Sequence, residues 1–234
     1  MSALRGYGLP ILIGLVIAAV GLLPWSPLAA VNVSHRPELP WAALVMTGYL
    51  VLLVTWLNGT GPPGTSALSR KQTLRLWPPA PRDNAGIGAW PLIGLLVLLY
   101  LLYIVIGRQA PPPDLGEYPT TAFRWSAFLM GGIMAGVVEE VAFRGYMQGG
   151  LERHDRANAI WITSLVFVLS HVTQGLGAML MLAPGLFAAS MLYGLLARRT
   201  GTLLPGMIIH VLGDLAHVFF GPLRGDASRL FVGG

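Results

Sequence analysis

The candidate chemical groups of this chain are ionisable side chains inside apolar stretches. A charged side chain costs at least about 2.5–3.5 kcal/mol at the centre of a bilayer, so such groups should pair, face a polar interior, or carry out chemistry. Their types suit acid–base chemistry on a bound molecule or coordination of a metal ion. The residues are Glu139, Glu140, Arg144, His171, His210, Asp214 and His217.

Helical spacing separates the two adjacent glutamates in the stretch GVVEEVAFRGY, residues 136–146. Glu140 and Arg144 are four residues apart, so they share a helix face and can pair. Glu139 is rotated by about 100° from Glu140, which indicates a different task for each. With Glu140 paired, Glu139 is free to point into a cavity as a general acid or base.

The histidines fall into two further patterns. Phe167 and His171 are four residues apart, as are His210 and Asp214, and His217 follows three residues later. The second pattern fits part of a metal site or an aspartate-oriented histidine. It also fits hydrogen bonding between membrane helices, worth about 0.6 kcal/mol on average. The spacing alone leaves these interpretations open.

Composition predicts the setting of these groups. Of the 234 residues, 54% are hydrophobic and 11% are charged, against roughly 25% charged in soluble domains. The mean hydropathy is +0.65. We therefore expect an all-α fold, a polytopic membrane helical bundle. The absence of cysteine excludes disulfides, thiolate metal sites and a cysteine nucleophile.

Apolar runs of about 20 residues predict about seven transmembrane helices. The first run is followed by others, which favours a retained helix over a cleaved signal peptide. Residues 175–183 could form a short separate segment. The predicted helices are Leu9–Leu23, Trp41–Leu57, Trp90–Ile106, Phe123–Gln148, Ala157–Val172, Met179–Ala197 and Leu203–Phe220.

The basic residues predict an orientation. With the N-terminus in the cytoplasm, nine Lys and Arg residues lie on the inner side and five on the outer side, in agreement with the positive-inside rule. We read the net charge of +5 as this topology signal and not as a nucleic-acid surface. The predicted units are an N-terminal three-helix region, residues 1–122, with a cytoplasmic loop at 59–89; a four-helix core, residues 123–220; and a C-terminal tail, residues 221–234.

Taken in order, the motifs read E-E-x-x-x-R, F-x-x-x-H and H-x-x-x-D. This pattern resembles the CAAX-protease and bacteriocin-processing family, which includes the Rce1-type prenyl-protein proteases. The resemblance covers roughly residues 123–220, and Gly194–Leu203 is similar to the family's link into its last motif. Asp214 stands where the family often has asparagine. The matching residues are Glu139, Glu140, Arg144, Phe167, His171, His210 and Asp214.

The resemblance implies an intramembrane endopeptidase that acts on a prenylated or hydrophobic peptide near the membrane surface. By this analogy, Glu139 and His171 activate a water molecule, and the Glu140–Arg144 pair positions Glu139. His210, with Asp214 behind it, supports the oxyanion. Metal dependence stays open: Glu139, His171 and His210 could supply three ligands to a divalent ion such as zinc. The expected partners are the substrate and the bilayer, without nucleic acid, and the oligomeric state is left open.

Two other classes of function compete with the protease. A proton- or ion-coupled transporter also carries ionisable residues inside the membrane, but the sequence shows no paired halves of the kind found in inverted-repeat carriers. A catalytically silent scaffold or bacteriocin-immunity protein is expected to have lost a motif residue, and all the main motif positions are present. Ion or proton flux in vesicles would identify a transporter, and unchanged function after Glu139→Ala would identify a scaffold.

Overall fold

Helices form all the regular structure in the described part of the chain, which confirms the all-α class. The computed structural model describes residues 4–22, 44–45, 47–49, 51–52, 55, 75–76, 87–108, 133–174 and 176–220. The α-helices are α1 (Leu9–Leu22), α5 (Ala89–Arg108), α7 (Ala135–Glu139), α8 (Gly149–Glu152), α9 (Ala159–Ser170), α10 (Leu176–Thr200) and α11 (Leu204–Phe220). Shorter helical segments are η1 (Leu4–Gly8), η3 (Glu140–Gln148) and η4 (His171–Gln174).

Most predicted helix bounds agree with the structure to within a few residues. The separate segment considered at 175–183 is wrong, because α10 runs without a break from Leu176 and contains Pro184 in its interior. The predicted fourth helix is divided into α7, η3 and α8. Residues 123–132, most of the predicted helix at 41–57, most of the loop at 59–89 and the tail at 221–234 lie outside the described residues.

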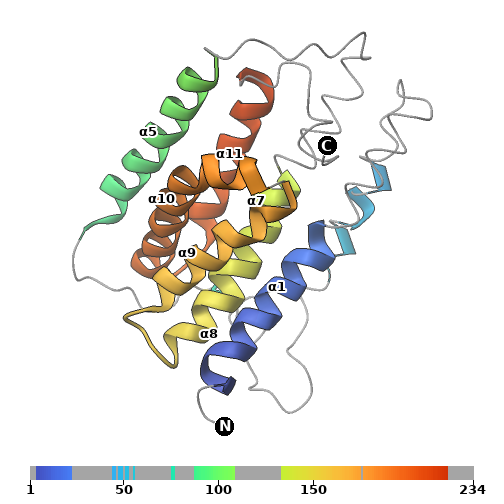
Figure 1. Ribbon diagram of the computed structural model, residues 1–234, viewed down its shortest axis with the longest axis vertical. Coiled ribbons are helices and arrows are strands. Elements are labelled where there is room, and N and C mark those ends of the chain that lie inside the picture. Colours follow the sequence, from blue (N-terminus) through green and yellow to red (C-terminus); the bar gives the residue numbers. More distant parts are fainter. Residues whose placement is uncertain are drawn as a thin grey trace.

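The segment η3 lies at the centre of the helical assembly. It packs against α1 on one side and against α9 and α10 on another, while α11 packs against α5, α7 and α10 (Figure 1). Figure 1 also shows α5 running alongside α10 and α11 at the edge away from α1. The ionisable side chains of η3 and α11 therefore meet within a bundle instead of on its surface.

Glycines allow the helices around η3 to approach closely. A Cβ atom added to Gly14 of α1 would lie 2.8 Å from Met147 and 3.0 Å from the carbonyl oxygen of Ala142. One added to Gly136 of α7 would lie 3.0 Å from the backbone nitrogen of Val211. Small residues of this kind are typical of helix interfaces in membranes, where close contact replaces the hydrophobic effect.

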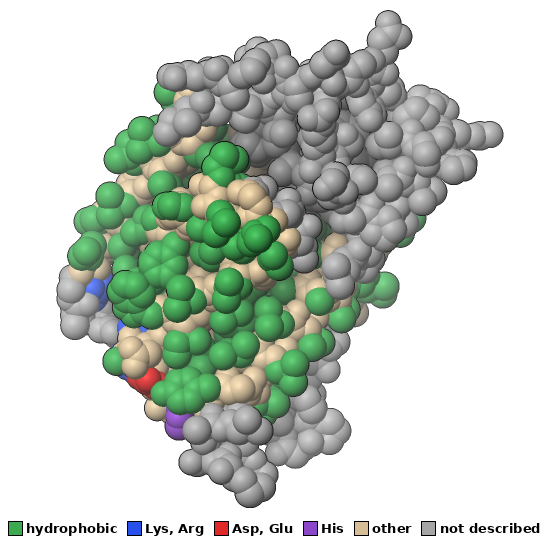
Figure 2. Space-filling view, in the orientation of Figure 1, with side chains coloured by type: hydrophobic (Ala, Val, Ile, Leu, Met, Phe, Trp, Pro, Cys, Tyr) green, Lys and Arg blue, Asp and Glu red, His purple; other side chains and the backbone are tan. Residues whose placement is uncertain are grey.

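Apolar side chains lie on the outer surface of the bundle as well as in its interior. Along α9, Phe167 is buried against the bundle, while Trp161, Leu165 and Leu169 on the opposite face are each more than half exposed. Figure 2 shows hydrophobic side chains over most of the described surface in this view, with charged and histidine side chains near its lower left. A helix that is hydrophobic all round is typical of a core or a membrane span.

One helix in the described residues, Met179–Thr200 within α10, is long and apolar enough to cross a membrane. The other apolar helices found there are shorter: Gly6–Leu22, Ala89–Val105, Ala159–Ser170 and Leu204–Ala216. The seven membrane spans, the multi-pass topology and the cytoplasmic N-terminus therefore stay predictions.

A tight turn fixes how α11 returns along α10. The α10 helix ends at Thr200, and Gly201 has φ of 71° and donates its backbone N–H to the Ala197 carbonyl at 3.0 Å. This is a left-handed helix terminus, a conformation that glycine adopts without steric cost. The turn brings the first half of α11, which carries His210, against the second half of α10.

Candidate active site

The two glutamates lie at a change in helix geometry. Glu139 is the last residue of α7, and Glu140 is the first of η3, a π-helix of nine residues. π-helical turns are rare and occur frequently at functional sites. Within η3, Glu140, Arg144 and Gln148 are fully buried. This segment thus holds a row of polar side chains inside the bundle.

Arg144 forms the ion pair that its spacing predicts. Its Nη1 lies 3.2 Å from Glu140 Oε1, and both side chains are buried. Within the described residues, none of its three guanidinium nitrogens has a partner with hydrogen-bond geometry. Two rings cover the cation instead: the guanidinium carbon lies 4.7 Å from the centre of Phe167 and 5.3 Å from that of Tyr193. Cation–π contact of this kind offsets part of the cost of a desolvated charge.

Three acidic side chains lie around the imidazole ring of His210. Its Nδ1 lies 3.0 Å from Glu140 Oε1, and Nδ1–H donates to that carboxylate. Its Nε2 lies 3.7 Å from Glu139 Oε2 and 3.6 Å from Asp214 Oδ2. The ring stacks on Tyr193, with 4.9 Å between centroids and an interplanar angle of 17°. His210 is therefore held by one carboxylate and faces two others with its second nitrogen.

The contacts of His210 include some that the residue spacing did not predict. Glu139 and Glu140 do diverge along the helix, yet both reach the same imidazole from opposite edges. The carboxylate on Nδ1 of His210 is Glu140, whereas Asp214 lies on the Nε2 side. Glu140 consequently contacts both Arg144 and His210.

His171 lies at the C-terminus of α9, where the helix tightens into η4. Its Nδ1 lies 2.8 Å from the Phe167 carbonyl oxygen. Because a carbonyl only accepts, Nδ1 carries a proton and donates it to Phe167, which leaves Nε2 as the ring nitrogen outside this bond. The rings of His171 and Phe167 are 4.7 Å apart. Among the described residues, the contacts of His171 reach the Arg144 group through Phe167 and do not include Glu139 or His210.

The ligand set considered from the sequence, Glu139, His171 and His210, is not assembled as a metal centre. In the described ranges, no group of three or more His, Asp or Glu side chains is arranged to hold a metal ion. Among the described residues, the donor geometry thus gives no support to a metalloprotease.

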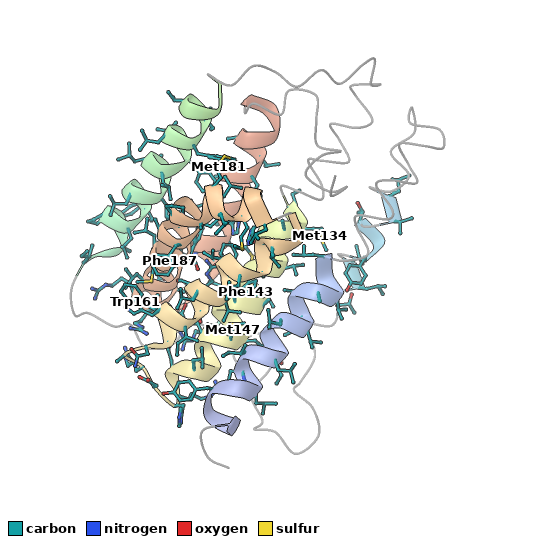
Figure 3. All side chains as sticks on the ribbon, viewed as in Figure 1. Met134, Phe143, Met147, Trp161, Met181 and Phe187 are labelled. Carbon is teal, nitrogen blue, oxygen red and sulfur yellow. The ribbon has the colours of Figure 1, made fainter. Side chains whose placement is uncertain are left out.

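Sequence reasoning missed two residues of this site. Tyr193 stacks on His210, but an aromatic residue on an apolar helix gives no distinctive pattern. Gln148 was detectable, because it continues the four-residue spacing of Glu140 and Arg144, and its Nε2 donates to the Gly194 carbonyl at 3.0 Å. Figure 3 shows that Phe143 and Met147 of the same segment lie among the helices, and both are buried. His217 lies in α11, outside the described side chains.

A second ionic cluster lies at the end of the bundle beyond η3. The Glu152 carboxylate accepts hydrogen bonds from Arg75, from Arg198 Nε at 2.9 Å and from Gln148 Nε2 at 2.9 Å. Burial disfavours the ionised form of Glu152, but the charge of Arg75 and the three hydrogen bonds outweigh it, so the pKa of Glu152 lies below its ordinary value. The cluster joins α8, α10 and the segment around Arg75.

We expect this cluster to make the stability of the protein depend on acid pH. Because the pKa of Glu152 is lower in the folded chain, its stabilising effect is complete above the ordinary glutamate pKa of about 4.3 and is lost as pH falls through the folded value. The melting temperature in detergent should therefore fall more steeply for wild type than for Glu152→Gln between neutral and acid pH. Curves that run parallel would contradict this role, since the other carboxyl groups are common to both proteins.

A family of known proteins matches the part of the chain that contains the candidate active site. Residues 121–216 match the sequence model of a family described as type II CAAX prenyl endopeptidase Rce1-like. None of the curated proteins and none of the solved structures compared matches the chain. The matched segment contains the two glutamates, Arg144, both site histidines and Asp214. Residues 121–216 are therefore similar to an Rce1-like domain, which agrees with the resemblance that the motifs predict.

Proposed function

We propose that this domain is an intramembrane endopeptidase that hydrolyses a peptide bond by direct attack of water. The observation that carries the proposal is the His210 ring held between two adjacent glutamates. Glu140 Oε1 lies 3.0 Å from Nδ1 of the ring, and Glu139 Oε2 lies 3.7 Å from Nε2. Glu140 is fixed on one side of the ring and positions it. Glu139 is less constrained on the other side and is the group for proton transfer.

Glu139 acts as the general base. Its side chain is 13% exposed, whereas that of Glu140 is 1% exposed and is in contact with both Arg144 and His210. The oxygen of a bound water attacks the carbonyl carbon while Glu139 accepts a water proton. When the C–N bond breaks, Glu139 returns that proton to the departing amine. The free Nε2 of His171 accepts a hydrogen bond from the same water and orients it.

His210 and Asp214 stabilise the oxyanion of the tetrahedral intermediate. The protonated imidazole donates Nδ1–H to Glu140 and leaves Nε2–H for the oxyanion. Asp214 contributes a second donor in its protonated form, the state in which a carboxyl group can replace the amide of an asparagine. Arg144 acts at a distance: it offsets the charge of Glu140 and so keeps that carboxylate on the ring.

The substrate class we propose is a prenylated or otherwise hydrophobic peptide cleaved close to the membrane surface. The description of the matched family as prenyl endopeptidases supports it, as does the apolar outer surface of α5, α9 and α10. The proposal includes a multi-pass chain of about seven spans with a cytoplasmic N-terminus.

The test uses a pair of fluorogenic peptides that differ only in a farnesyl group on the cysteine. Purified wild type in detergent should cleave the farnesylated peptide faster, with or without a chelator, and His171→Ala should lose this activity. Equal cleavage of both peptides would overturn the prenyl specificity. Full cleavage by His171→Ala would overturn the mechanism, and proton flux into vesicles that survives the same substitution would favour a transporter.

A further inference from the structure

The helix α5 lies outside the matched segment 121–216, yet one of its side chains reaches the candidate active site. The hydroxyl of Tyr193 donates to the hydroxyl of Tyr100 at 3.0 Å, across 93 residues of sequence. Tyr193 is the residue whose ring stacks on His210. Two contacts therefore connect α5 to the histidine that faces Glu139 and Asp214.

The packing around Tyr100 fixes its position. Its ring lies against Gly213 of α11, so closely that a Cβ atom added to this glycine would collide with it. On the other side, Tyr100 packs against a buried cluster of Leu92, Leu96, Tyr193 and Leu196. A tyrosine confined between two helices holds its hydroxyl in place, which is the requirement for a positioning hydrogen bond.

Tyr193 is confined on its remaining sides. It is 2% exposed, and its ring lies 5.3 Å from the guanidinium carbon of Arg144. A Cβ atom added to Gly206 would lie 3.4 Å from the Tyr193 ring and 3.5 Å from Glu140 Oε2. The ring thus occupies the space between His210, Arg144 and the turn of α11 at Gly206.

We propose that Tyr100 is a positioning residue for His210 and acts through Tyr193. The hydrogen bond between the two hydroxyls sets where the Tyr193 ring lies, and the ring sets the plane of the imidazole. The orientation of Nε2 toward the reacting carbonyl then depends on α5, a helix that the family match does not include. The kinetic part of this proposal rests on the proposed peptidase activity.

The kinetic experiment compares Tyr100→Phe, Tyr193→Phe and the double variant. Each single change removes one hydroxyl but keeps the ring, so kcat should fall by roughly three- to tenfold, the equivalent of one hydrogen bond, while KM is unchanged. The double variant should lose no more than either single variant, because all three lack the same bond. Tyr193→Leu, which also removes the stacking ring, should be slower than Tyr193→Phe.

A spectroscopic measurement keeps the proposal separate from the proposed function. The ring resonances of His210, assigned by their loss in His210→Asn, should move in Tyr100→Phe and in Tyr193→Phe. They should stay in place in Tyr146→Phe, whose ring packs in a different cluster around Val141. Moved resonances without any cleavage by wild type would support the positioning role while the peptidase fails. Unmoved resonances, or a lower melting temperature with unchanged kcat, would overturn the role of Tyr100.

Discussion

Replacement of Arg144 by methionine is expected to lower the free energy of unfolding by about 3–5 kcal/mol, the usual cost of removing one partner of a buried ion pair. Glu140 would lose its arginine partner while fully buried, and Phe167 and Tyr193 would lose the charge they cover. Reversible unfolding in mixed detergent would measure the loss.

Two comparisons show whether the loss comes from the pair. Arg153→Met removes an exposed arginine and should change the free energy of unfolding by less than about 0.5 kcal/mol. Glu140→Gln combined with Arg144→Met should be more stable than Arg144→Met alone, because the buried carboxylate is removed together with its arginine partner. An Arg144→Met protein as stable as wild type would show that the buried pair does not hold η3 in place.

Replacement of His210 by alanine is expected to lower kcat by about 10²–10³, the usual effect of removing one oxyanion donor. KM should change little, because the donor acts on charge that develops only in the transition state. Steady-state cleavage of the farnesylated peptide would separate the two constants.

The matched control is His154→Ala. His154 is exposed in the connection after α8 and contacts Tyr7, so its removal should leave both constants near those of wild type. A His210→Ala protein with raised KM and unchanged kcat would instead place His210 in ground-state binding of the substrate.

Local spacing predicted the parts of this molecule that depend on neighbours along one helix. The Glu140–Arg144 pair follows from a separation of four residues, and long apolar runs gave the bounds of α1, α5 and α11 to within two residues. The π-helical geometry of η3 was not predictable in this way. It changes the register of the helix without a marker such as proline.

Long-range contacts account for the rest of what the sequence did not reveal. Glu140 meets His210 across 70 residues and Tyr193 meets Tyr100 across 93, and no periodic pattern encodes which helices become neighbours. Tyr193 lies on α10, whose apolar residues extend around the helix, so its buried face cannot be told from its outer face by hydropathy. The membrane spans were also predicted from hydropathy. Because a helix that is apolar all round fits a buried core as well as a membrane span, the number of crossings stays a prediction.

The role of Glu139 as the general base can be tested by measuring kcat/KM of Glu139→Gln for the farnesylated peptide, beside wild type of matched melting temperature. Glutamine keeps the size of the side chain but cannot accept the proton of the attacking water. We expect kcat/KM to fall by about 10²–10⁴, the range that general-base catalysis contributes. A Glu139→Gln protein that retains more than about a tenth of the wild-type kcat/KM would contradict this role, because the loss would be smaller than the contribution of a general base.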